Sequence, residues 1–394
     1  MTHPRLDILI YAHDGRGLGH ASRSIGIGMA LRRLYPHLKV LFLSGSSFSA
    51  ELIGPAPLDW LKLPSYATRI NRGKSRGISG PSNYTDRELG TLRAEAIKQV
   101  VQLYRPRAVL CDHSPQGKHR ELLPAQKASQ NTQWVLGVRG VVGAVPQVFS
   151  EEARETFKHS FHTILWYGDE AVLGSTGRHE LEKNFSCPPV ACGYVSRLKE
   201  LTHWQQEDKS REKEFAGIIS IPWQGEHSHN IIRNIATALE HIGPGYGQWN
   251  IFLGGSPDQR KEPGQWLQRL PHVRLHSPGS QYAQRLQHAK TALIYGGYNS
   301  ITDVLCMNIP SVILVRAMGD KEQQRHLHLL AGHTGNQLRI LPETEVTATT
   351  LEQSLRDQLN QPPSRHTVNI NGAEQAARLL ARATGHPAEP QETG

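Results

Sequence analysis

Short apolar runs rich in β-branched residues recur along the chain, and stretches long enough for a helix separate them. Because these runs do not alternate between apolar and polar residues, they are typical of strands buried on both faces of a parallel sheet. They form two sets, at residues 6–12, 40–45, 108–112, 134–139 and 162–168, and at residues 216–221, 250–255, 273–277, 291–297 and 311–315. The alternation of strands with helices predicts an α/β protein.

The helical stretches and a charged segment predict the domain organisation. Helical spacing of apolar residues is clearest at residues 23–35, 230–242 and 299–308. Residues 196–215 are charged and show no strand period, so we interpret them as an interdomain connector. The resulting prediction is an N-terminal Rossmann-like domain, a second Rossmann-like domain, a C-terminal helix and a flexible tail, at residues 1–195, 216–370, 371–385 and 386–394.

Composition limits the class of protein and the kind of partner. The 394 residues include 44 Lys and Arg against 35 Asp and Glu, so the formal net charge is +9. Such an excess suits an anionic partner, and it leaves nucleic acid, an acidic membrane surface and a phosphorylated small molecule open. The four cysteines are too few for a disulfide framework in a chain of this length. No apolar run approaches the roughly 18 residues of a membrane span, so we expect a cytoplasmic protein, with peripheral contact at the cytoplasmic face of a membrane left open.

The first predicted strand leads directly into a glycine-rich loop at residues 13–24. Glycines let a ligand approach the main chain, and a helix that begins near His20 directs its N–H groups and its dipole at such a ligand. A dinucleotide fingerprint is disfavoured, because a G-x-G-x-x-G frame that starts at Gly15 meets His20 in place of the last glycine. A phosphate-binding P-loop is disfavoured as well, because its first glycine would fall on Thr68. An ordinary tight turn between strand and helix is the alternative.

A second glycine-rich turn precedes a predicted helix in the second domain. Gly296 and Gly297 end a strand, and the helix is predicted to begin at Asn299 or Ser300. Ser300 and Asp303 also fit a capping box, which is the alternative explanation for that carboxylate. Asp320 and Gln323, after the predicted strand at residues 311–315, mark a second polar helix start, so two such starts follow neighbouring parallel strands. Together they place carboxylate, amide and backbone donors at the edge of the sheet where open α/β sheets bind ligands.

These segments resemble the nucleotide-sugar glycosyltransferases of the GT-B fold. The resemblance is to the family of the lipid II-forming UDP-N-acetylglucosamine transferase of peptidoglycan synthesis and to related predicted bacterial glycosyltransferases. It rests on GRGLGH at residues 15–20, GGYNSITDVLCMNIPSVILV at 296–315 and DKEQQ at 320–324. The resemblance implies two Rossmann-like domains that face each other across a cleft. It also implies transfer of a sugar from a nucleotide-sugar, such as UDP-GlcNAc, with inversion at the anomeric carbon.

The resemblance also implies roles for individual residues. Asp303 would hold the ribose hydroxyls, and Gln323 and Gln324 the sugar hydroxyls, while the nucleobase would lie near His276. The diphosphate and the remaining donor contacts would fall to Gly17, Gly19, Gly225, Gly296, Gly297, Asn299 and Ser300.

Residues 221–230 depart from the family pattern, because Gly225 is their only glycine and Trp223 and Gln224 stand where a diphosphate usually meets bare backbone. This departure leaves a non-catalytic nucleotide-sugar-binding protein open as an alternative. A nucleotide-sugar hydrolase or epimerase on the same scaffold is a second one.

Glycosyl transfer needs a base that deprotonates the acceptor. His20 is the candidate, because the ordinary pKa of an imidazole lies near neutral pH. Asp112 ends the strand at residues 108–112, at the same predicted sheet edge, and we expect it to orient His20. The alternative for Asp112 is a cap of its own loop. No Asp-x-Asp occurs, so we expect a metal-independent enzyme without a cofactor, with the nucleotide-sugar as co-substrate and UDP as product.

A basic stretch at residues 69–77 adds candidates on the acceptor side. Arg72 and Lys74, together with Arg16 of the first loop, would hold an anionic or lipid-linked acceptor. A solvated flexible loop is the alternative. The stretch lacks the interleaved aromatic residues of a nucleic-acid site, so a nucleic-acid partner is disfavoured.

Overall fold

The computed structural model describes residues 5–14, 18–71, 74–78, 80, 82–140, 149–205, 214–222, 228–279, 281–316, 322–362 and 365–386. The chain forms two compact units. The first contains Met1–Gln205 and Asn369–Gly394, and the second contains Gln206–Val368. Each unit has its own parallel sheet with helices on both faces, which confirms the predicted α/β class.

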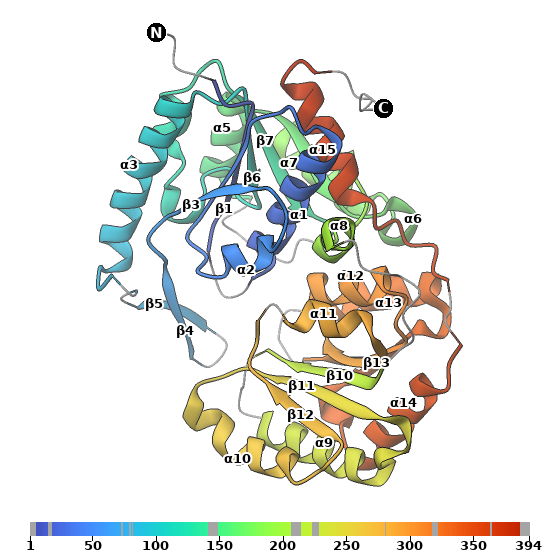
Figure 1. Ribbon diagram of the computed structural model, residues 1–394. Helices are drawn as coiled ribbons and strands as arrows, with labels where there is room; N and C mark the ends of the chain where they lie inside the picture. The colour runs from blue at the N-terminus through green and yellow to red at the C-terminus, as the bar shows by residue number, and fades with distance from the viewer. Residues whose placement is uncertain are drawn as a thin grey trace. The chain divides into compact units, whose positions relative to one another are not determined.

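The sheet of the first unit has seven strands in the order β3-β2-β1-β6-β7-β8-β9, all parallel (Figure 1). Its strands are β1 (Ile8–Ala12), β2 (Val40–Ser44), β3 (Asp59–Lys62), β6 (Ala108–Asp112), β7 (Gln133–Arg139), β8 (Phe161–Tyr167) and β9 (Val190–Ala191). The chain proceeds outward from β1 to β3 on one side and from β6 to β9 on the other. Between β1 and β6 the strand order therefore reverses, and α/β sheets bind ligands beyond the carboxyl ends of the strands at such a point.

Helices cover both faces of this sheet. On one face α1 (Gly19–Leu34) packs against α8 (Arg197–Gln205) and α15 (Gly372–Ala383). On the other face four helices share one apolar core with the strands: α3 (Asp86–Tyr104), α4 (Leu123–Lys127), α5 (Glu151–Ser160) and α7 (Thr176–Phe185). The shorter α2 (Ser49–Ile53), η1 (Lys118–Arg120) and α6 (Glu170–Leu173) complete the unit.

The second unit has a sheet of six parallel strands in the order β12-β11-β10-β13-β14-β15, and the order reverses between β10 and β13. Its strands are β10 (Phe215–Ile221), β11 (Gln248–Leu253), β12 (Val273–His276), β13 (Ala289–Tyr295), β14 (Ser311–Val315) and β15 (Leu338–Pro342).

The helices of the second unit also lie on both faces of its sheet. One face packs on α9 (Ser228–Ile242), α10 (Pro257–Gln268) and α14 (Ala348–Leu359). The other carries α11 (Gln281–Gln287), α12 (Tyr298–Cys306) and α13 (Glu322–Thr334) (Figure 1). Three short turns of 3-10 helix are η2 (Pro244–Tyr246), η3 (Gly335–Gln337) and η4 (Glu343–Glu345).

All ten predicted strands are present, because each is an apolar run with few alternatives to a buried sheet position. Of the basic stretch at residues 69–77, expected as a loop, the described residues instead lie in the antiparallel strands β4 (Ala67–Asn71) and β5 (Lys74–Ile78). The segment interpreted as a connector, residues 196–215, contains α8 and the first residue of β10. Its helical part is anchored by Glu200, which is 1% exposed and accepts two hydrogen bonds from Arg33 at 2.9 and 3.0 Å.

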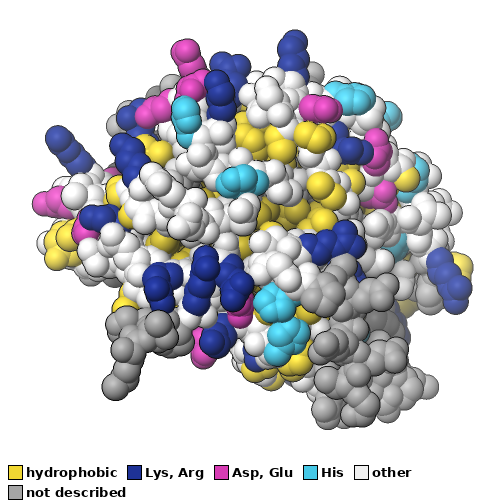
Figure 2. Space-filling model, turned by 90° about the horizontal axis from the view of Figure 1, so that it is seen from above, with side chains coloured by type: hydrophobic (Ala, Val, Ile, Leu, Met, Phe, Trp, Pro, Cys, Tyr) yellow, Lys and Arg dark blue, Asp and Glu magenta, His cyan; other side chains and the backbone are white. Residues whose placement is uncertain are grey.

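On the face seen in Figure 2, Lys and Arg side chains lie among acidic, histidine and apolar side chains. In the part of the chain that the structure describes, no helix is both long and apolar enough to span a membrane.

Candidate active site

The carboxyl ends of β1, β6 and β7 meet at the edge of the first sheet where the strand order reverses. His13 follows β1, Asp112 ends β6 with His113 directly behind it, and Arg139 ends β7. The helix α1 begins at Gly19, so its first turn brings His20 to the same edge. Polar and titratable side chains thus gather at the position where this type of sheet binds ligands.

His20 and Asp112 form the pair that the sequence predicts. His20 Nδ1 is hydrogen-bonded to Asp112 Oδ2, and Arg23 Nη2 donates to the same oxygen at 2.9 Å. A carboxylate only accepts, so Nδ1 carries the proton of the bond to Asp112. The lone pair of His20 therefore lies on Nε2. Asp112 is 1% exposed and the side chain of His20 is 23% exposed, as expected for a buried orienting carboxylate and an accessible ring. The pairing is confirmed, and its catalytic role stays a prediction.

The surroundings keep this imidazole neutral. Burial lowers the pKa of His20 well below its usual 6.5, and the positive charges of Arg23 and Arg139 lower it further. A neutral imidazole at pH 7 is the form that accepts a proton.

Two further imidazoles, His13 and His113, lie beside His20. Their ring centroids are 4.0 and 5.3 Å from that of His20, and 6.1 Å from each other. Burial lowers the pKa of both rings well below the usual value, and the neighbouring His20 lowers it further. His113 has a φ of +78°, and its N–H donates to Gly137 O at 2.7 Å. The three rings form a cluster of neutral imidazoles.

A buried ion network lies behind the cluster. Arg93 forms an ion pair with Asp14 at 2.6 Å and donates to both carboxylate oxygens of Glu121, at 2.6 and 2.9 Å. Tyr66 donates its N–H to Asp14 at 2.6 Å and its O–H to Glu121 at 2.9 Å. Because Asp14 directly follows His13, this network fixes the main chain that carries the first imidazole.

In the second unit, an open helix N-terminus lies beyond β13. Gly297 is the N-cap of α12 with a φ of −76° and a ψ of 144°, and no described side chain caps the helix. No described atom lies within 4 Å of the position that a Cβ on Gly297 would take. Asn299, Ser300 and Asp303 lie inside the helix, so the capping-box alternative for Ser300 and Asp303 is wrong. The start of α12 therefore has space for a ligand beside Gly297, and a helix N-terminus favours an anion.

Aromatic rings pack beside His276 at the end of β12. The ring of His276 stacks on Phe252, with centroids 5.0 Å apart, and Tyr282 of α11 meets Phe252 edge-on at 5.4 Å. Burial raises the pKa of Tyr282, and the negative charge of Asp303 raises it further. The residues that the resemblance assigns to nucleobase and ribose thus lie in the same part of the second unit.

The hydrogen bonds of His276 determine which of its nitrogens carries a proton. Asn250 Oδ1 accepts from Arg285 Nη1 at 3.2 Å and from His276 Nε2 at 2.8 Å. Because a guanidinium only donates, the Asn250 atom is the oxygen, and His276 Nε2 carries the proton. Burial and the charge of Arg285 lower the pKa of His276, so its Nδ1 presents a lone pair.

The two predicted glutamines lie in the first turn of α13. Gln323 Oε1 is buried and has no hydrogen-bond partner among the described residues, while Gln324 is exposed. His326 of α13 stacks on Tyr298 of α12 with centroids 6.5 Å apart, so the starts of both helices lie side by side. A buried amide oxygen without a partner is a group that a ligand hydroxyl would satisfy.

Comparisons with solved structures identify the fold. Neither a protein-family model nor a curated protein sequence matches the chain. The UDP-GlcNAc 2-epimerase of Methanocaldococcus jannaschii is 12% identical and aligns over 96% of this chain and 100% of its own, with a TM-score of 0.63. The UDP-GlcNAc 2-epimerase of Neisseria meningitidis bound to UDP-GlcNAc is 13% identical over 96% and 99%, with a TM-score of 0.62. MurG of Acinetobacter baumannii is 11% identical over 98% and 96%, with a TM-score of 0.52.

The chain has the GT-B fold. Within this GT-B chain, Arg16, Gly17, Arg72 and Gly225 lie outside the described residues. Lys74 opens β5, and only its main chain is described. The predicted residues that the structure does describe fall into two groups, one beyond the carboxyl ends of the strands in each unit.

Sequence reasoning missed several members of the two groups of this GT-B chain. They are His13, Asp14, Arg23, Arg93, His113, Glu121 and Arg139 in the first unit, and Asn250, Tyr282 and Arg285 in the second. For His13 and His113 a signal exists, since both directly follow predicted strands at the edge that already singled out Asp112. For Arg93 and Glu121 no local signal exists, because each lies in a segment without a motif.

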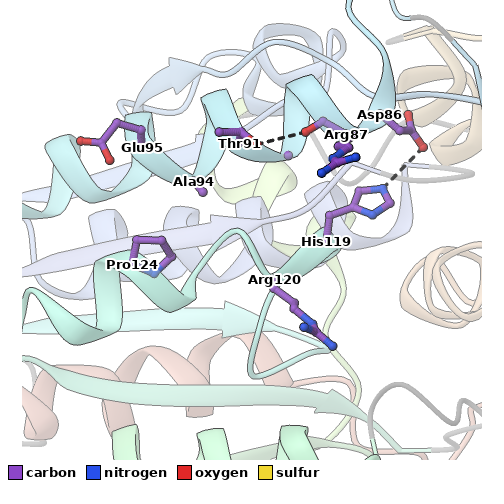
Figure 3. Close-up of a pocket in the computed structure, with 9 residues that line it drawn as sticks. Asp86, Arg87, Thr91, Ala94, Glu95, His119, Arg120 and Pro124 are labelled. Carbon is purple, nitrogen blue, oxygen red and sulfur yellow. Dashed lines mark hydrogen bonds and ion pairs between the residues drawn. The ribbon is translucent and has the colours of Figure 1, made fainter.

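A groove on the first unit of the GT-B chain lies apart from these predictions. It has a volume of about 880 Å³ and lies between α3 and the segment η1–α4 (Figure 3). Asp86 pairs with His119 at 3.5 Å, and Arg120 pairs with Glu152 at 2.6 Å. The groove contains none of the predicted site residues, and these ion pairs neutralise part of the charge of the residues that line it.

Proposed function

We propose that the protein is a glycosyltransferase that moves a sugar from a UDP-sugar, such as UDP-GlcNAc, to an acceptor hydroxyl or amine. The observation that carries the proposal is the His20–Asp112 pair, in which a buried carboxylate orients a neutral imidazole. The names of the compared structures support UDP-sugar chemistry, because they include MurG and an epimerase bound to UDP-GlcNAc.

In the proposed reaction, His20 Nε2 takes the proton of the acceptor hydroxyl. The acceptor oxygen then forms a bond to the anomeric carbon, and the bond from that carbon to the diphosphate oxygen breaks. Asp112 stabilises the imidazolium that forms, because it accepts the hydrogen bond from Nδ1. We propose inversion at the anomeric carbon, since one displacement step needs only one such base.

We propose that the second unit binds the donor. The open N-terminus of α12 at Gly297 would meet the negative charge of the departing diphosphate with backbone N–H groups and the helix dipole. Asp303 would accept hydrogen bonds from the ribose hydroxyls, and Gln323 Oε1 one from a sugar hydroxyl. His276 Nδ1 would accept the imide N–H of a uracil.

A mutational test of the base uses His20→Ala and Asp112→Asn, with UDP release in the presence of UDP-GlcNAc and candidate acceptors as the assay. We expect both variants to lose about 10²–10⁴-fold in kcat, because proton transfer and tautomer control act in the same step. Their affinity for UDP should stay within about threefold of the wild type. His159→Gln is the matched control, because that side chain is 74% exposed on α5. Unchanged turnover in His20→Ala would remove this residue from the mechanism.

A UDP-sugar 2-epimerase is the second candidate, and the higher TM-scores of the two epimerases, 0.63 and 0.62 against 0.52 for MurG, favour it. The products separate the two functions. Incubation with UDP-GlcNAc and no acceptor, followed by proton NMR, yields an epimerised UDP-sugar from an epimerase and free sugar with UDP from a hydrolase. A transferase leaves the donor unchanged until an acceptor is added. Tight UDP-sugar binding without any of these products would identify a non-catalytic binding protein.

A further inference from the structure

Arg23 is a buried arginine that has no part in the proposed reaction as described so far. It follows His20 by three residues on α1, a spacing that puts two side chains on the same face of a helix. The side chain of Arg23 is 3% exposed. A guanidinium loses its hydration on burial, so it is stable inside a protein only beside a group that compensates its charge. The groups that Arg23 contacts therefore show what it does.

One of these groups is the carboxylate of Asp112, which also holds His20. Arg23 Nη2 donates to Asp112 Oδ2 at 2.9 Å, and His20 Nδ1 donates to the same oxygen. The side chain of Asp112 is 1% exposed, so bulk water does not compete for these two hydrogen bonds. A single carboxylate oxygen thus connects a permanently charged guanidinium with a titratable imidazole.

Arg23 also lies directly beside the imidazole. Its Nη2 is 3.2 Å from His20 Nδ1. Because Nδ1 donates its proton to Asp112, it has no lone pair to offer the guanidinium, and the contact is one between a positive charge and the ring. A positive charge at this distance disfavours the imidazolium. Burial accordingly lowers the pKa of His20, and the charge of Arg23 is the next cause.

The other groups that face His20 do not replace Arg23 in this role. Arg139 at the end of β7 adds a second positive charge, but it lowers the pKa of His20 less than Arg23 does. Arg23 is also the arginine that donates to Asp112. The rings of His13, behind β1, and of His113, behind β6, are neutral, because burial lowers the pKa of both.

Charges on η1 and α3 are opposed by carboxylates. Lys118 of η1 is faced by Asp14, Asp86 and Glu121. Arg93 of α3 pairs with Asp14 and with Glu121, each at 2.6 Å. Among the described residues, the charge balance at His20 therefore depends on the three groups Asp112, Arg23 and Arg139.

We propose that Arg23 is a positioning residue of the active site, which acts through Asp112 and keeps His20 a neutral imidazole with its proton on Nδ1. Asp112 alone would favour the imidazolium, because an anionic neighbour stabilises the charged form of a base. Arg23 offsets this effect and leaves in place the hydrogen bond that orients the ring. The consequence for catalysis rests on the proposed function, whereas the protonation of His20 can be measured without turnover.

The direct test is an NMR titration of the full-length protein with 15N-labelled histidine side chains. The signals of His20 are those that disappear in His20→Ala. In the wild type we expect a neutral ring with the proton on Nδ1 at pH 7. In Arg23→Gln, which keeps a hydrogen-bond donor but removes the charge, the pKa of His20 should rise by about one to two units. The added proton should reside on the imidazole, since a carboxylate is ordinarily the weaker base.

Two further variants separate the charge of Arg23 from its other contacts. Arg23→Lys keeps the positive charge, so the pKa of His20 should stay within about half a unit of the wild-type value. Arg107→Met is the matched control. It also removes an arginine from a carboxylate, that of Asp7 at 3.2 Å, but Arg107 precedes β6 and lies at the opposite edge of the sheet from Asp112. This variant should leave the pKa of His20 unchanged.

The pH dependence of the rate distinguishes a positioning role from a structural one. In Arg23→Gln, kcat/KM with UDP-GlcNAc as donor should fall about tenfold at acidic pH. A rise of one unit in the pKa of the base reduces its neutral fraction tenfold there. The value should approach that of the wild type as the pH rises, and Arg23→Lys should keep the wild-type profile. A purely structural defect would lower kcat/KM by the same factor at every pH.

The outcomes separate this inference from the proposed function. An imidazolium at His20 in the wild type at pH 7 would overturn the inference, whether or not any variant folds. An unchanged pKa of His20 in folded Arg23→Gln, or a loss of kcat/KM that does not depend on pH, would do the same and leave the transferase standing. If the pKa of His20 rises as expected but the wild type converts no UDP-sugar, the proposed function fails and the control of His20 by Arg23 remains.

Discussion

The substitution Arg93→Met tests how strongly the buried network behind the histidine cluster stabilises the first unit. Arg93 is 0% exposed and donates to Pro64 O at 2.7 Å, besides pairing with Asp14 at 2.6 Å and with Glu121 at 2.6 and 2.9 Å. The methionine side chain fills much of the volume of the arginine side chain, but it carries no charge that could neutralise the carboxylates. The variant therefore leaves two buried carboxylates, on Asp14 and Glu121, without their cation.

The magnitude follows from the burial of the groups left behind. Removal of one partner of a buried ion pair costs about 3–5 kcal/mol, because the remaining charge is desolvated and uncompensated. Glu121 is 0% exposed and Asp14 is 8% exposed, so both lie in that regime. The O–H groups of Tyr11 and Tyr66 still donate to Glu121 and offset a part. We expect a loss of about 4 kcal/mol in the free energy of unfolding of the first unit at pH 7.

Hydrogen exchange with mass spectrometry in increasing urea measures this loss in the first unit separately from the second. Peptides that cover β1 and β6 report on the first unit, and peptides that cover β10 and β13 in the same sample are the internal control. The double variant Arg93→Met/Glu121→Gln should lose less than the sum of the two single variants, by about 1–3 kcal/mol, because the pair is coupled. A loss below about 1 kcal/mol in Arg93→Met, or additive single losses, would refute the reasoning.

Three further outcomes are expected. The value of kcat/KM should stay high below pH 6.5, because the neutral form of His20 is the active base. Burial, and then the nearby arginines, lower the pKa of His20 below its usual 6.5. A loss of kcat/KM with an apparent pKa at or above 7 on the acidic side would contradict this assignment. Gly297→Ala should change the free energy of unfolding by no more than about 1 kcal/mol, since the φ of −76° at Gly297 suits any residue. It should weaken UDP binding, measured by calorimetry, about tenfold or more, while the control Gly332→Ala in α13 leaves UDP binding unchanged. Glu200→Ala should lower the unfolding free energy by about 1–2 kcal/mol in urea titration, because the 22% exposed Arg33 retains access to water; no change would mean that α8 is held by its apolar contacts alone.

Local pattern and chemistry determined much of the architecture. The ten apolar runs form strands because a continuous apolar run is best buried in the interior of a parallel sheet. The glycine turn before α12 was predictable to within two residues. The exposed or mixed segments were not predictable in this way. β3 and the β4–β5 hairpin lack a continuous apolar run, so nothing in their own sequence distinguishes them from loops.

The sequence by itself determined the fold class and the two sets of strands, because both follow from hydrophobic burial, and it singled out His20 and Asp112 as candidate partners, because parallel strands end at the same edge of a sheet. Only the tertiary structure decided the rest. Arg93, Glu121 and Asp14 lie in segments far apart in the chain, and His13, His20 and His113 meet only because β1 and β6 are neighbours at the reversal of strand order. Strand order depends on the packing of the whole sheet, and no local stretch of residues carries that information.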